Sequence, residues 1–344
     1  MTEPFDCRLD GAKGGLAVEA TGLATASEEL PYVDIDGVEP EGHDVTLRLA
    51  DGTTRVISAI GPRYDEFVTA LGEAWRRRRR ASLLVWTGDA PIDEYVTHTG
   101  ETSSTVVLFP DGLTVEGWSG APQVAPFGLI DNVERDGYRI TVSLRGSLAP
   151  VVVRGLGPRT DEFLADLDRA RSDAVARVSR SYAALSEDLD GFTAPDGWAV
   201  TQDQAGAHWA ALRTAVGRAG RETELTTLAR IAGSLRLGVK LQKDGEAMPF
   251  VLAAAGSRIA VESTSSDKAR ATFVFETDDV DRLNAVLVLT SFRREAISSP
   301  PEDLGRWAPA VRLLESVQWA RNILVDRVVH DATWEQRIAG ALTA

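Results

Sequence analysis

The sequence predicts an α+β protein that contains two tandem copies of one unit and a different C-terminal part. Two observations support this prediction: matched segments recur about 95 positions apart, and within each copy period-two alternation gives way to helical spacing. The length of 344 residues and the hydrophobic content of 44% fit two or three globular domains. We expect these domains at residues 1–82, 83–190 and 191–344.

The repeat depends on segments that match in the same order in both copies. Residues 60–71 and 156–167 share Gly-Pro-Arg-x-Asp-Glu-Phe, and residues 31–39 and 126–134 share Pro-aromatic-x-x-Ile-x-x-Val-Glu. A third match, Gly-Leu at 22–23 and 112–113, lies upstream of both. Because three blocks keep one order, the sequence indicates an internal duplication.

In each copy, strand patterns come first and a helix pattern comes last. Residues 45–49 and 140–144 alternate apolar and polar side chains, which is typical of strands with one buried face. After Pro62 and Pro158, two acidic residues follow in the first turn of a predicted helix, where the helix dipole favours them. The apolar faces of the two predicted helices consist of Phe67, Ala70, Leu71, Ala74 and Trp75, and of Phe163, Leu167, Ala170 and Ala174. Each copy is therefore predicted to be a run of antiparallel strands closed by one amphipathic helix.

This order resembles the pleckstrin-homology (PH) superfold, in particular its bacterial PH-like and GRAM-like branches. The resemblance covers roughly residues 14–82 and 104–180, and residues 11–15, with three glycines, are expected to be a flexible lead-in. Trp75 lies where eukaryotic members keep a helix tryptophan, whereas the second copy has Arg171 there. The resemblance implies an open sheet edge and a groove beside the terminal helix, both of which can take up a peptide.

Phosphoinositide binding is not expected. The superfold binds these lipids through Lys and Arg residues of its first hairpin, and this sequence has Glu19 and Asp111 in the matching segments, 19–22 and 109–112. The net charge of −14 also argues against nucleic acid and anionic membranes as partners, because both are polyanions. No integral membrane contact is expected, since no apolar run approaches the length of a spanning helix.

The C-terminal part is predicted to be a different α+β domain. Helical patterns fill about 203–232 with a break near 217–220, and four strand patterns follow at 235–241, 249–254, 257–263 and 270–276. A helix opens at 278, although its apolar continuation also fits a strand, and a long last helix is expected across 313–328. This part is either an unrelated α+β domain or a third, divergent PH-like unit.

No catalytic, cofactor-binding or metal-binding residue is predicted. The four histidines are far apart in sequence, and the single cysteine, Cys7, cannot pair within the chain. His330, with Asp331 and Glu335 nearby, is expected at a solvated helix end. The one cysteine and the acidic N-terminus, which lacks the features of a signal peptide, favour a cytoplasmic protein.

Two features are candidate partner-binding sites. The first is the cationic run at the end of the first helix, which consists of Arg76, Arg77, Arg78, Arg79 and Arg80. It either pairs with the negative end of its own helix or docks on an acidic surface, on a partner or on this chain's own repeats. The second is Trp118, in an insertion of about five residues that the second copy carries around 117–124. It either anchors a partner or covers an open end of its own sheet.

Composition and motifs therefore favour a non-catalytic interaction or scaffolding module whose partner is another protein or a peptide. The alternative is an enzyme or small-ligand binder with a pocket in the C-terminal part or at its junction with the second repeat.

Overall fold

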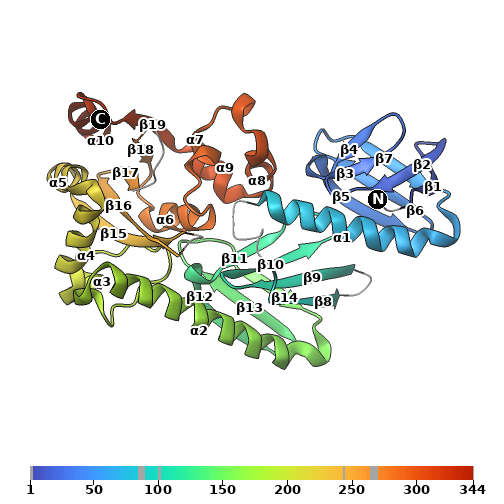
Figure 1. Ribbon diagram of the computed structural model, residues 1–344, viewed down its shortest axis with the longest axis horizontal. Coiled ribbons are helices and arrows are strands. Elements are labelled where there is room, and N and C mark those ends of the chain that lie inside the picture. The colour runs from blue at the N-terminus through green and yellow to red at the C-terminus, as the bar shows by residue number, and fades with distance from the viewer. Residues whose placement is uncertain (1–2, 84–89, 100–101, 243–244, 264–269, 344) are drawn as a thin grey trace.

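The computed structural model describes residues 3–83, 90–99, 102–242, 245–263 and 270–343. The fold is α+β, as predicted: two consecutive units each end in a long helix, and a C-terminal α+β region follows them (Figure 1). Within the described ranges, no helix combines the length and the apolar character that a membrane crossing requires.

The first unit is a seven-stranded antiparallel sheet with one helix. The strand order is β4-β3-β2-β1-β7-β6-β5, and helix α1 (Tyr64–Ser82) follows β7. The strands are β1 (Phe5–Leu9), β2 (Ala12–Val18), β3 (Gly22–Ala24), β4 (Glu29–Pro31), β5 (Ile35–Glu41), β6 (Asp44–Leu49) and β7 (Thr54–Ser58). Phe67, Leu71 and Trp75 of α1 are fully buried against this sheet, as their helical spacing predicts.

The expected flexible lead-in at 11–15 is wrong. Strands β1 and β2 form the first hairpin of the unit, and Arg8 lies opposite Lys13 in its ladder. Gly14 and Gly15 lower the strand propensity of β2, so the sequence pattern did not reveal it. The turn at 19–22 consequently joins β2 to β3 and belongs to the second hairpin.

The second unit repeats these elements in two separate sheets. One sheet has the order β11-β10-β9-β8, the other has the order β12-β13-β14, and helix α2 (Thr160–Leu185) follows. The strands are β8 (Asp93–Thr99), β9 (Thr102–Phe109), β10 (Gly112–Gly117), β11 (Gln123–Pro126), β12 (Ile130–Asp136), β13 (Arg139–Leu144) and β14 (Val151–Arg154). In the first unit β1 pairs with β7. Between the corresponding segments of the second unit, at β8 and the end of β14, the structure describes one backbone hydrogen bond, from His98 N–H to Gly155 O (3.2 Å).

The two units place matching residues in matching positions. Phe67 and Phe163 are both fully buried on the terminal helix, as predicted. Each makes an edge-to-face contact with an aromatic ring of the first strand, Phe5 or Tyr95, at a centroid distance of 5.2 Å in both units. The equivalence therefore extends to side-chain packing.

Helix α2 also connects the second unit to the C-terminal region. Its first half, including Phe163 and Leu167, packs in the core of the second unit, whereas Val178 and Tyr182 lie in the core of the C-terminal region. Its 26 residues, compared with 19 in α1, provide this extension.

The C-terminal region contains a five-stranded antiparallel sheet in the order β15-β16-β17-β18-β19. The strands are β15 (Ser234–Leu241), β16 (Ala247–Ala255), β17 (Arg258–Ser263), β18 (Ala271–Glu276) and β19 (Leu324–Val329). The helices are α3 (Gln202–Ala205), α4 (Trp209–Val216), α5 (Glu222–Ile231), α6 (Val280–Leu289), α7 (Arg294–Ser298), α8 (Ala308–Leu313), α9 (Glu315–Asn322) and α10 (Trp334–Thr343). Helices precede, interrupt and follow the strands, an order that the first two units lack.

Three C-terminal expectations are resolved by the structure. The segment after residue 278 is a helix, because the carboxylate of Asp279 caps α6 by accepting from Arg282 N–H (2.9 Å). The predicted break near 217–220 is a π-helical turn, Gly217–Arg221, between α4 and α5. The long last helix is wrong: α8 and α9 are short, and Leu324–Val329 pairs with β18 as the fifth strand. The apolar positions of residues 313–328 fit a helix face, but the open edge of β18 supplies a strand partner for Leu324–Val329.

Candidate functional site

The candidate site is the space between the edge strand and the terminal helix of each unit. We call the space between β5 and α1 the first groove, marked by Val38, Gly72 and Arg76. The equivalent space between β12 and α2 is the second groove. Both β5 and β12 are edge strands of their sheets.

The first groove is occupied by a loop of the second unit, residues 118–122, which connects β10 to β11 and which we call the Trp118 loop. The backbone N–H of Val38 on β5 donates to the carbonyl oxygen of Trp118 (2.8 Å). A backbone hydrogen bond at an open sheet edge is the basic contact of β-augmentation. The loop therefore contacts the edge strand of the first unit through one backbone hydrogen bond.

The indole ring of Trp118 uses space that Gly72 leaves open. A Cβ atom at position 72 would lie 2.3 Å from ring carbon Cη2 of Trp118, which is closer than van der Waals contact allows. The guanidinium of Arg76 lies 4.7 Å from the ring centroid, and the indole N–H donates to Ser103 Oγ (3.2 Å). Glycine and arginine one turn apart on α1 thus form a seat for the half-buried tryptophan.

Two further arginines of the cationic run contact the second unit. Arg79 is buried and donates from Nη2 to the carbonyl oxygen of Gly120 (2.6 Å). Arg80 pairs with Glu94 (3.0 Å) and lies 3.4 Å from Glu116. These contacts hold α1 against the Trp118 loop at Gly120 and against Glu116 of β10, which precedes the loop.

The structure therefore brings the two sequence-predicted features together. Arg76, Arg79 and Arg80 contact the Trp118 loop and its flanking strands, whereas Arg77 and Arg78 are exposed. The sequence left open whether the cationic run docks on a partner or on this chain's own repeats. These three arginines dock on this chain's own second repeat.

Burial changes the acid–base properties of this contact. Burial raises the pKa of Glu116 to about 7, and the cation of Arg80 only partly opposes this effect. Burial also lowers the pKa of Arg79 to about 10. Among the described residues, Glu116 Oε2 and Arg79 Nε have no hydrogen-bond partner. The contact consequently contains buried polar groups that are incompletely paired.

The second groove contains a cavity of about 270 Å³. Its lining consists of Asp131, Asn132, Val133, Leu164, Leu167, Asp168 and Arg171. Asp131 pairs with Arg145 at 3.5 Å, so one wall carries a neutralised carboxylate. The PH resemblance implied a groove beside the helix, but no sequence pattern marks these residues as a site.

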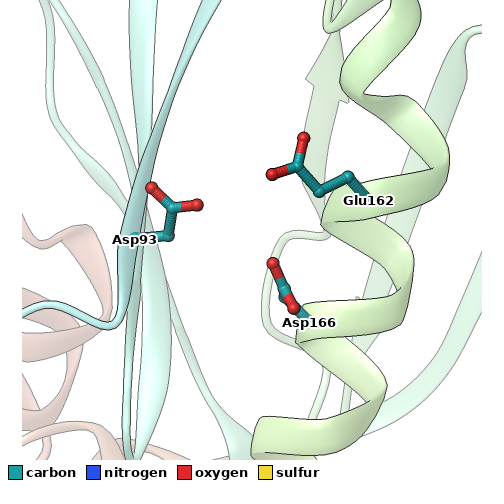
Figure 2. A group of neighbouring side chains, drawn as sticks. All are labelled: Asp93, Glu162 and Asp166. Carbon is teal, nitrogen blue, oxygen red and sulfur yellow. The ribbon is translucent and has the colours of Figure 1, made fainter.

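A cluster of acidic side chains lies beside the second groove's helix, on its opposite flank. Figure 2 shows Asp93 of β8 facing Glu162 and Asp166 of α2, with single oxygens of the three within 4.8 Å of one another. The guanidinium of Arg159 is 2.9 Å from both Asp93 and Glu162, and Tyr95 donates its hydroxyl to Asp166 (2.6 Å). Arg169 pairs with Asp166 (2.8 Å), so two arginines oppose the three carboxylates, and the cluster is an ion-pair network that joins β8 to α2.

The C-terminal region contains a second polar network, which is buried. His330 lies between two glutamates, with Nδ1 3.3 Å from Glu224 and Nε2 3.0 Å from Glu262. Its ring stacks on Trp334 at a centroid distance of 4.6 Å. The expectation of a solvated helix end at His330 is wrong, because residues about 70 and 100 positions away in sequence enclose it.

Arg221 completes this network. Its side chain is 2% exposed and lies 3.5 Å from Glu224 and 3.3 Å from Glu262. Burial alone would lower the pKa of His330, but its hydrogen bonds to Glu224 and Glu262 raise it to about 9. Burial would likewise raise the pKa of Glu224, whereas the contacts with His330 and Arg221 lower it to about 2. Two cations thus balance two anions, and the network fastens β19 and α10 to α5 and β17.

The junction of the second unit with the C-terminal region holds a cavity of about 30 Å³. The pairs Arg177–Asp111 (2.5 Å) and Lys240–Asp196 (2.6 Å) lie in its lining. This volume equals roughly that of one water molecule in the liquid, whereas pockets for small molecules take about 300–1,000 Å³.

The first hairpin of the first unit is formed by β1 and β2 and not by the segment at 19–22 that the sequence predicted. Arg8 and Lys13 are its basic residues, and Asp10 at its turn pairs with Arg55. The segment around Glu19, on which the phosphoinositide expectation depended, belongs to the second hairpin.

Comparison of the sequence with protein-family models and with curated proteins finds no match.

Proposed function

We propose that the protein is a non-catalytic protein-interaction or scaffolding module built from two tandem PH-like units. The succession of antiparallel strands and one terminal helix in both units supports the PH-like assignment. The groove between an edge strand and that helix is a place where a sheet can add an extended segment from another chain.

One observation carries the proposal: the Trp118 loop occupies the first groove. It combines a backbone hydrogen bond from Val38 with an aromatic side chain seated over Gly72 and Arg76. Backbone bonding supplies affinity and a side-chain pocket supplies specificity in this mode of recognition. Within its own chain, the fold thus already places a loop from one unit in the groove of another.

The alternative function is an enzyme or small-ligand binder with a pocket in the C-terminal part or at its junction with the second repeat, and the junction gives it weaker support. The cavity there has a volume of about 30 Å³ and is lined by charges that already pair with each other. The larger cavity, about 270 Å³, lies in the second groove instead. A further cavity, of about 230 Å³, also lies in the second unit and is lined in part by Thr97, Ser104 and Val152. Because the larger cavities lie in the second unit and not at the junction, they favour a peptide or protein partner.

Affinity purification of the tagged full-length chain from its source cells, followed by mass spectrometry, tests the proposal. We expect replicate purifications to recover the same partner protein at a level comparable to the bait. The purified partner and the bait should then form a complex when they are mixed. If no protein forms a reconstituted complex, and a small metabolite raises the melting temperature of the pure chain in a dose-dependent way, the proposal is wrong and the alternative function is favoured.

A further inference from the structure

The internal repeat allows the first groove to serve as a template for the second. Strands β5 and β12 carry the same irregularity in register, between Ile35 and Gly37 and between Ile130 and Asn132. Val133 therefore corresponds to Val38, whose N–H binds the Trp118 loop. The edge position that takes a peptide carbonyl in the first unit is repeated on β12.

The helix side of the groove differs between the units at three positions, one of which is Ser172 in place of Arg76. Asp168 stands where the first unit has Gly72, and Arg171 stands where it has Trp75. In the first unit, Trp75 is fully buried and its indole N–H donates to the carbonyl oxygen of Ile35 (2.9 Å), which closes the floor of the groove. In the second unit Arg171 lines the corresponding part of the groove, which contains the cavity of about 270 Å³.

These differences change the side chain that fits. The floor of the second groove is apolar, with Leu167 buried and Leu164 and Val133 half-buried. Asp168 is exposed beside this floor, and no ion pair from it is found among the described residues. Arg171 also lines the groove but forms no ion pair with Asp168 in the part of the chain that the structure describes, and an indole in the position of Trp118 would remove this carboxylate from water without itself pairing with it. A lysine or arginine would cover the apolar floor with its methylene groups and pair its charge with Asp168.

We infer that the second groove binds an extended segment of a partner protein that places a lysine or arginine over Leu164 and beside Asp168, with its backbone paired to Val133 on β12. The inference rests on the proposed function, since it names the partner's chemistry for that function. The net charge of −14 supports a cationic segment, because long-range attraction increases its association rate.

Selection of random octapeptides displayed on phage against the full-length protein tests the inference, with the enriched peptides then synthesised for titration. We expect them to share a lysine or arginine. Asp168→Asn should weaken their binding by about tenfold or more, the usual effect of losing a charge-assisted hydrogen bond. Val133→Pro should abolish binding, because proline lacks the outward N–H but is tolerated on an edge strand. Asp173→Asn, an exposed acid of α2 outside the cavity lining, is the matched control and should have no effect.

A gain-of-specificity variant strengthens the test. Asp168→Gly recreates the floor of the first groove, so selection against it should enrich aromatic residues where wild-type protein enriches basic ones. Circular dichroism and melting curves establish that each variant is folded before its binding is interpreted.

The outcomes separate the two levels of inference. Peptides without a basic residue that bind Asp168→Asn normally but not Val133→Pro would overturn the partner chemistry and leave the proposed function standing. Peptides insensitive to both variants would overturn the second groove as the site. Self-association of the wild-type chain that Val133→Pro abolishes would identify a second copy as the occupant and overturn the foreign partner. If no peptide is enriched above background, the inference fails, whereas the proposed function is decided separately by the affinity purification and reconstitution described above.

Discussion

At the scale of single residues, the network around His330 has a defined dependence on pH. The pKa of His330, about 9, exceeds its ordinary value of 6.5, so the bound proton stabilises the fold fully below about pH 6.5 and this stabilisation is lost as the pH rises through 9. The pKa of Glu224, about 2, lies below its ordinary value of 4.5, so its contribution is present above about pH 4.5 and is lost as the pH falls towards 2. Because both shifts describe one network, they are not added together.

We predict that His330→Gln lowers the free energy of unfolding by on the order of 3 kcal/mol at pH 6 and by much less at pH 10. The reason is that the wild-type network has lost its proton at the higher pH. Urea unfolding followed by tryptophan fluorescence measures the difference, since Trp334 stacks on the imidazole. His98→Gln, at an exposed position, is the control. An equal difference at pH 6 and pH 10 would contradict the prediction.

At the scale of secondary-structure elements, helix α1 and the Trp118 loop are shaped for each other at one glycine. Helix interiors disfavour glycine by about 1 kcal/mol relative to alanine, so Gly72 lowers the intrinsic stability of α1. Its compensation is the space for the Trp118 ring, which a Cβ atom would enter at 2.3 Å. The effects of substitutions at Gly72 and at Trp118 on stability should therefore depend on each other.

We predict that the effect of Gly72→Ala on the free energy of unfolding has opposite signs in the wild-type chain and in a chain that carries Trp118→Ala. In the wild-type chain it should destabilise by roughly 1–3 kcal/mol, because it overpacks the seat of Trp118. In a Trp118→Ala chain, itself destabilised by about 2 kcal/mol, it should stabilise by up to about 1 kcal/mol through helix propensity. Urea unfolding of the four proteins gives the coupling energy. Gly340→Ala on α10, where an added Cβ meets no atom within 4 Å, should stabilise both backgrounds alike. Additive effects of the first pair would refute the mutual fit.

Sequence patterns predicted most elements and missed those that depend on a distant partner. The four strands from Leu235 to Glu276 agree with prediction within about two residues, because alternation and turn residues are local signals. Strand β1 and strand β19 were missed, since glycines in β2 and a helix-like spacing around Leu324 concealed them. In both cases a neighbouring strand's open edge decides the structure, and that edge is not visible in local sequence.

At the scale of the whole molecule, the three parts meet through contacts that composition could not reveal. Trp118 and the cationic run were each identified by sequence, but their mutual contact joins residues more than 35 positions apart in different repeats. Arg312 of the C-terminal region likewise donates to Asp36 (3.0 Å) and to the carbonyl oxygen of Val33 (2.7 Å) in the first unit. A repeat predicts how each unit folds but gives no signal for how units dock.

The docking of the first two units should depend on pH through Glu116. Because burial raises the pKa of Glu116 from 4.5 to about 7, the contribution of this residue to stability is greatest below about pH 4.5 and declines as the pH rises through 7. We predict that Glu116→Gln removes this decline, on the order of 3 kcal/mol at most, and leaves the rest of the pH profile unchanged. Unfolding of both proteins from pH 4 to pH 8 measures it. Glu134→Gln, at an exposed position of β12, is the control. Parallel profiles for wild type and Glu116→Gln would show that the carboxylate does not titrate at the contact.

The charge of the whole molecule leads to a final prediction, that vesicles containing phosphoinositides do not bind this protein. The first hairpin presents two cations, Arg8 and Lys13, and each basic residue near an anionic surface contributes only about 1 kcal/mol. The net charge of −14 acts against this attraction, and three of the five arginines of the cationic run are engaged with the second unit. Co-sedimentation at physiological salt should therefore leave the protein in the supernatant. Pelleting that is lost in an Arg8→Glu, Lys13→Glu double variant would show that the hairpin recognises the headgroup. Pelleting lost instead in Arg77→Glu, Arg78→Glu would assign lipid binding to the exposed part of the cationic run.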